Sequence, residues 1–157
     1  MKKVILIGGV ILVVVGLIVW GKALQKDAVV FFGDTNVACL DNGHQQIELH
    51  IHPVLRITVD GEEEAIPANI GIQGACMSET HTHDATGVLH IETATRERFE
   101  QLQFTDFFDV WGRDIERSGY TLEAFVNGTA VASVEDIPLE DGDQIELRYT
   151  SIESAGE

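Results

Sequence analysis

Lysine is missing from most of this 157-residue chain. All four lysines lie within residues 1–26, and all 26 acidic residues lie from Asp27 onward. Six arginines against 26 acids leave residues 27–157 with a formal charge of −20. Because phosphate binding requires clustered cations, this composition excludes a nucleic-acid partner. The same charge repels anionic lipid headgroups and attracts cations.

The chain also lacks the patterns of several enzyme classes. None of its serines stands in a G-x-S-x-G context, and it contains no glycine-rich phosphate-binding loop. A chain of 157 residues is too short for a large barrel or a two-domain enzyme. We therefore expect one compact domain with a short appendage.

One long apolar run is present near the N-terminus. Residues 4–20 read VILIGGVILVVVGLIVW and contain no charged side chain. A helix of this length spans about 25 Å, the lower edge of what a bilayer core requires. Trp20 occupies the position of an interfacial aromatic residue. We predict a membrane anchor at residues 1–20, with a transmembrane helix at 4–20.

A cleaved signal peptide is the alternative, since lysines precede the apolar run. The small residues that cleavage requires are interrupted by Lys22. The flanking lysines are nearly balanced, with Lys2 and Lys3 on one side and Lys22 and Lys26 on the other. The short N-terminal flank and the acidic, cysteine-poor domain favour a single-pass membrane protein with its C-terminal domain outside the cytoplasm.

The remaining chain divides into a tether at 21–38, a β-rich domain at 39–150 and a disordered tail at 151–157. Apolar residues alternate over 46–59, as in a half-buried strand. Asp60-Gly61 and Asn127-Gly128 predict hairpin turns.

Only one short helix is predicted, at residues 102–111. Its aromatic residues recur with helical spacing, and Gly112 suits the position just after a helix. We interpret this stripe as core. The expected fold class is α+β, mainly antiparallel, with a β-grasp-like C-terminal half.

Five of the six histidines fall in two patches, His50 and His52, then His81, His83 and His90. An H-x-H pair on a strand points both imidazoles to one side, here opposite the apolar side. If the second hairpin closes around residues 84–87, His81 lies directly across from His90. The sixth histidine, in a turn region, is expected at the surface.

Imidazole with carboxylate suits copper or zinc better than calcium or magnesium. Asp84 follows the second H-x-H and is a candidate ligand, or a carboxylate that orients an imidazole. We therefore predict a metal site formed by His50, His52, His81, His83, His90 and Asp84. A hydrogen-bonded polar network on the sheet and a pH-sensing cluster are the alternatives.

The two cysteines, Cys39 and Cys76, each precede one histidine patch. A disulfide between them would join the two segments and stabilise the fold by about 3–4 kcal/mol. A thiolate ligand from Cys76 and two free buried thiols are the alternatives.

The segments HIHPVLRITVDGEEEAIPANIGI, CMSETHTHDATGVLHIE and FFDVWG resemble an uncharacterised family of membrane-anchored extracytoplasmic bacterial and archaeal proteins. Its pattern combines H-x-H, P-A-x-I-G-I, H-T-H-D-x-x-G-x-x-H-x-E and F-F-x-x-W-G over roughly residues 39–150. Members often carry a further histidine where this chain has Val54. The resemblance implies a location and a site, but no reaction. Position by position, it singles out His50, His52, Cys76, His81, His83, Asp84, Gly87, His90 and Glu92.

Three functions are consistent with these features. The first is a membrane-tethered domain that binds copper or zinc and has no catalytic residues of its own. The second is a small metalloenzyme in which Glu79 or Glu92 acts as general base. The third is a surface interaction domain with structural histidines. Its protein partner is not identified by the sequence.

Overall fold

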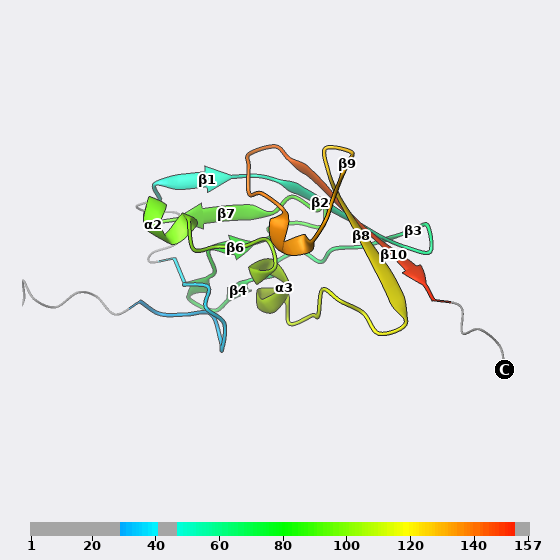
Figure 1. Cartoon of the computed structure of the whole chain (residues 1–157). Coiled ribbons are helices and arrows are strands. Elements are labelled where there is room, and N and C mark those ends of the chain that lie inside the picture. The colour runs from blue at the N-terminus through cyan, green and yellow to red at the C-terminus, as the bar shows by residue number, and fades with distance from the viewer. Residues whose placement is uncertain (1–28, 41–46, 153–157) are drawn as a thin grey trace, which may run out of the picture.

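The computed structural model describes residues 29–40 and 47–152, whose strands form three sheets (Figure 1). The predicted membrane helix at 4–20 and His44 lie outside these residues. Within the part of the chain that is described, no helix is long and apolar enough to cross a membrane. The described domain is mostly β-sheet with a few short helices, which confirms a β-rich α+β fold.

The largest sheet has five strands in the order β3-β2-β10-β8-β9. Asp60-Gly61 and Asn127-Gly128 turn its two hairpins, as predicted, and Asp60 and Asn127 both have φ of 50°. The central pair, β2 and β10, is parallel, and the long chain between the two strands supplies the crossover that parallel pairing requires. The strands are β2 (Val54–Val59), β3 (Glu62–Glu64), β8 (Tyr120–Val126), β9 (Thr129–Val131) and β10 (Gln144–Ser151).

A smaller sheet has the order β1-β7-β6 and is antiparallel throughout. Its strands are β1 (Leu49–Ile51), β6 (Thr80–His81) and β7 (His90–Thr93). Pro53 interrupts the strand but not the register, since its carbonyl accepts a hydrogen bond from Leu89 N and Val54 bridges Val88. The chain therefore passes from β1 into β2 and joins the two sheets (Figure 1).

A two-stranded sheet, β4 (Ile72–Gln73) with β5 (Cys76–Met77), leads into β6. Cys76 forms a disulfide with Cys39, which confirms the preferred pairing. Cys39 also bridges Ser78 by backbone pairing. Residues 37–40 are thereby held against the sheet, and Val37 is fully buried.

The helices differ from the prediction of a single one at 102–111. The aromatic helix is shorter, α3 (Asp106–Trp111), because the Asp106 carboxylate accepts a hydrogen bond from Gln103 N and ends the preceding turn. Gly112 is left-handed at φ 72°, as predicted. A second helix, α2 (Arg96–Phe99), and the 3-10 turn η1 (Val134–Asp136) were not predicted, because such short elements show no periodicity.

The core is formed by residues of the five-stranded sheet, the three-stranded sheet and α3, which contacts β6. Phe104, Phe107 and Phe108 are each at most 2% exposed, and Trp111 packs against them, so the aromatic stripe is core as predicted. Leu89 and Ile91 extend this core beneath the smaller sheet. The opposite side of that sheet is left for polar side chains.

Candidate metal centre

The three-stranded sheet brings five histidines together on one face. His81 pairs directly with His90, as the hairpin prediction required. His50 pairs with Glu92, and the same register carried past Ile51 places His52 opposite His90. His52, which directly follows β1, thus lies in a row with His90 of β7 and His81 of β6. The edge strand β1 and the residue after it supply the first histidine patch, and the β6–β7 hairpin supplies the second.

The nitrogen atoms of these histidines form two groups of three that can hold a metal ion. Within each group the potential ligand atoms lie within 4.8 Å of one another. The first group is His50, His52 and His90, and the second is His81, His83 and His90. The structure therefore brings together all five histidines of the predicted site.

The closest nitrogen pairs have the spacing expected of ligands on one ion. Nε2 of His50 lies 3.3 Å from Nδ1 of His90, and Nε2 of His81 lies 3.3 Å from Nε2 of His83. Two nitrogens bound tetrahedrally to zinc, each about 2.0–2.1 Å from it, stand about 3.4 Å apart. Each pair is thus spaced like one edge of a coordination tetrahedron.

Glu92 adds a carboxylate beneath the first group. Its Oε1 lies 2.8 Å from Nε2 of His50 and 3.8 Å from Nδ1 of His90. The side chain is fully buried, although a carboxylate is costly to bury unless charge or hydrogen bonds compensate it. The position suits either a further ligand or a carboxylate that orients His50.

His81 is locked in the tautomer that a ligand needs. Its Nδ1 lies 2.9 Å from the carbonyl oxygen of Ser78, and a carbonyl can only accept, so Nδ1 carries the proton. Nε2 is therefore the unprotonated nitrogen of this ring, and it lies 3.3 Å from Nε2 of His83. The ring is fully buried, so its orientation is fixed by packing as well as by this bond.

His90 is uncharged at neutral pH. Burial, reinforced by the neighbouring His83, His52 and His50, lowers the pKa of His90 to about 4, although Glu92 acts in the opposite direction. Metal binding requires the neutral imidazole. The crowding of imidazoles thus keeps the shared histidine in its ligand form.

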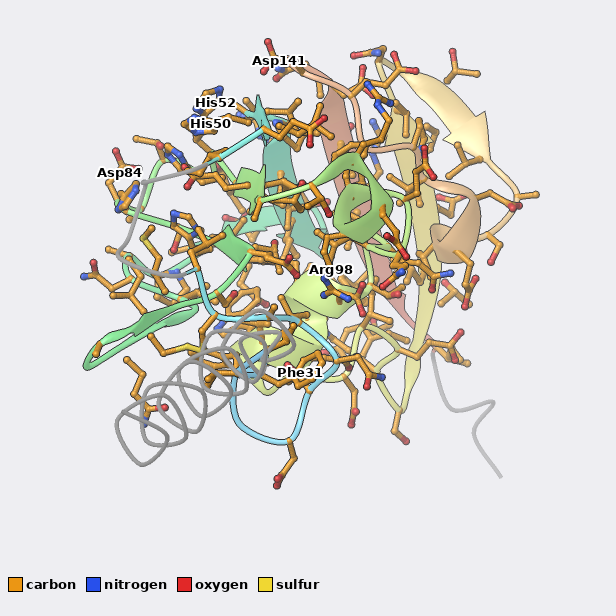
Figure 2. All side chains as sticks on the ribbon, turned by 90° about the vertical axis from the view of Figure 1, so that its left-hand side faces the viewer. Phe31, His50, His52, Asp84, Arg98 and Asp141 are labelled. Carbon is orange, nitrogen blue, oxygen red and sulfur yellow. A yellow bond between two sulfur atoms is a disulfide. The ribbon has the colours of Figure 1, made fainter. Side chains whose placement is uncertain are left out.

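Acidic residues flank the cluster at its rim (Figure 2). Asp141 accepts a hydrogen bond from the backbone N of His52 at 2.8 Å, and its carboxylate lies 3.4 Å from Nδ1 of the same residue. No sequence signal identified Asp141, which reaches the site from the loop before β10. Its contact depends on pairing between segments far apart in the chain.

Asp84, a predicted ligand, belongs to neither histidine group. Its carboxylate accepts hydrogen bonds from the backbone N and the hydroxyl of Thr86, which lower its pKa. It thereby closes the loop that ends at Gly87. Any side chain at Gly87 would meet the carbonyl oxygen of Leu55, since an added Cβ would stand 2.3 Å from it. Coordination by Asp84 stays a prediction.

Glu79 and Cys76 are held by other contacts. Arg98 binds the Glu79 carboxylate with two bonds, at 3.1 and 2.6 Å, and this raises the pKa of Arg98. The backbone N of Ala38 donates to the same carboxylate. Glu79 therefore secures the N-terminal segment and is not available as a general base. Cys76 lies in the disulfide, so the thiolate ligand considered above is absent from this structure.

The donor set is thus five imidazoles with one buried carboxylate, supported by a fixed tautomer. The comparisons with known proteins add no assignment: no family model matches the chain, and neither a curated protein nor a solved structure matches it.

Proposed function

We propose that this chain is a membrane-anchored extracytoplasmic domain that binds copper or zinc through the histidine cluster. The observation that carries the proposal is the set of imidazole nitrogens within coordination distance of one another around His90. Imidazole donors suit copper and zinc, whereas calcium and magnesium prefer oxygen.

Burial and charge support the same function. His81 and Glu92 are fully buried, so two of the donors are placed before any ion arrives. The formal charge of −20 on residues 27–157 raises the local concentration of cations. The disulfide agrees with an oxidising compartment outside the cytoplasm, and the apolar run at 4–20 supplies the proposed anchor.

We favour binding over catalysis because of how the carboxylates are engaged. Arg98 and Ala38 hold Glu79, and Glu92 contacts His50. A metalloenzyme that uses one of these carboxylates as general base would need it to face the substrate. Of the two general-base candidates, Glu79 and Glu92, only Glu92 then remains. If the Glu92→Gln variant still bound metal but lost a turnover that the wild type shows, the result would favour catalysis.

The strand order of the large sheet supports the β-grasp expectation. Two hairpins flank the parallel pair of β2 and β10. We extend the proposed β-grasp-like arrangement to this whole sheet, because β2 and β3 come from the first half of the domain.

The test is metal retention by the full 157-residue chain in mild detergent. After stripping with a chelator and reloading with zinc or copper, we expect stoichiometric metal by elemental analysis. The double variant His50→Ala/His81→Ala should lose most of it. His44→Ala is the matched control, since the sequence predicts a surface position for that histidine, away from both histidine patches. Equal retention by wild type and the double variant would refute the proposal and favour structural histidines.

A further inference from the structure

We infer that the cluster is a binuclear centre in which the imidazole of His90 bridges two ions. This inference rests on the proposed metal binding and specifies its stoichiometry and ligand sharing. The two histidine groups share His90 and no other member. A histidine that belongs to both groups can serve both, because its ring carries two nitrogen atoms.

The first ion site lies on the Nδ1 side of His90. This nitrogen stands 3.3 Å from Nε2 of His50 and 3.8 Å from Oε1 of Glu92. Nε2 of His50 and Oε1 of Glu92 are themselves 2.8 Å apart. An ion above this triangle is bound by two imidazoles and a carboxylate, and His52, directly after β1, completes the site.

The second ion site uses His81 and His83. Their ring centroids lie 5.3 and 4.5 Å from that of His90, and their Nε2 atoms lie 3.3 Å apart. A ring nitrogen has one lone pair in the plane of the ring, so it binds one ion. If Nδ1 of His90 serves the first ion, Nε2 must serve the second.

Each site has its own buried support. Glu92 underlies the first, and the bond from His81 Nδ1 to the Ser78 carbonyl orients a ligand of the second. Because the supports are independent, removing a ligand of one site leaves the other site with its fixed donors. A single shared site would lose its ion in either case.

Binding of the second ion removes the ring proton of His90. The first ion binds Nδ1 of neutral His90, whose Nε2 then carries the ring proton. The second ion displaces that proton, which passes to the buffer, and no electron is transferred. The bridging ring becomes an anion, and the nearby carboxylates of Glu92, Asp84 and Asp141 add negative charge around the two cations.

The experiment is a copper(II) titration of the full chain in mild detergent, followed by elemental analysis and electron paramagnetic resonance. We expect two copper ions per chain. The spin intensity should rise with the first equivalent and fall with the second, because a bridging imidazolate couples the two spins. The matched single variants His52→Ala and His83→Ala, each at the rim of one site, should bind one copper with full spin intensity.

The outcomes separate this inference from the proposed function. One copper in wild type, or two with undiminished spin intensity, would overturn the bridge while leaving metal binding intact. No bound copper or zinc in any form would refute the proposed function itself. His90→Ala should abolish the coupling, and thermal unfolding of each metal-free variant checks that it remains folded.

Discussion

The two sheets of this domain compensate their carboxylates in different ways. At the large sheet, Glu64 of β3 binds Arg113 at 2.5 Å and Arg117 at 2.7 Å. At the small sheet, the fully buried Glu92 contacts the imidazoles of His50 and His90. A guanidinium is always charged, whereas an imidazole gains charge only with a proton or a metal. The imidazoles beside Glu92 therefore compensate its charge only when they carry a proton or a metal ion.

Glu79 provides the internal contrast, because it lies directly before β6 of the small sheet and its charge is compensated by an arginine. Its exposure is 2%, comparable to that of Glu92, and Arg98 holds it with two hydrogen bonds. Burial alone thus does not distinguish a structural carboxylate from one at a candidate metal site. The kind of cation beside it does.

The largest expected effect comes from removing this arginine. Arg98→Ala leaves the Glu79 carboxylate buried without its guanidinium, so the free energy of unfolding should fall by about 3–5 kcal/mol. Denaturant titration of the metal-free protein measures it. Arg148→Ala is the control, because its pair with Glu146 is exposed to solvent and should contribute little. Equal losses in both variants would contradict the structural role of Glu79.

Zinc binding should change the free energy of unfolding by an intermediate amount. At free zinc 100-fold above its dissociation constant, a single bound ion raises the free energy of unfolding by about 2.7 kcal/mol. Glu92→Gln should require about 10–100-fold more zinc for the same gain, because a carboxylate beside His50 is lost. Thermal unfolding against zinc concentration measures both. Glu64→Gln serves as the control and should leave the zinc dependence of stability unchanged. If Glu64→Gln also required more zinc, the proposed difference between the carboxylates of the two sheets would be wrong.

The smallest expected effect is on how the free energy of unfolding changes at acidic pH. The hydrogen bond from Arg117, followed by that from Arg113, lowers the pKa of Glu64 below 4.5, although burial opposes this. A lowered folded-state pKa stabilises the fold above the unfolded-state pKa, and this contribution disappears as the pH falls through the folded-state value. Because the group is partly exposed, the contribution is about 1 kcal/mol or less. The stability difference between wild type and Glu64→Gln should therefore shrink from pH 7 to pH 3; a constant difference would contradict it.

Glu64 also shows where sequence patterns failed. The run Glu62-Glu63-Glu64 predicts a solvated outer face, and Glu62 and Glu63 are indeed exposed. Glu64 instead binds two arginines that follow α3, about fifty positions along the chain. Long-range ion pairs leave no local signature, because either partner alone resembles an ordinary surface charge.

The sequence alone determined the features that depend on neighbours along the chain. Strand alternation placed the histidines opposite the apolar side, and the expected hairpin predicted the pairing of His81 with His90. The two hairpin turns and the left-handed Gly112 follow from the conformations open to asparagine, aspartate and glycine. These features have short-range steric causes.

Only the tertiary structure decided which segments meet. The pairing of β1 with β7 brings His50 and His52 to His90, and the parallel pairing of β2 with β10 carries the loop of Asp141 to the same rim. The structure also selected the disulfide among three alternatives for the cysteines. Such pairings depend on the apolar surface that the whole domain buries, so no short stretch of residues specifies them.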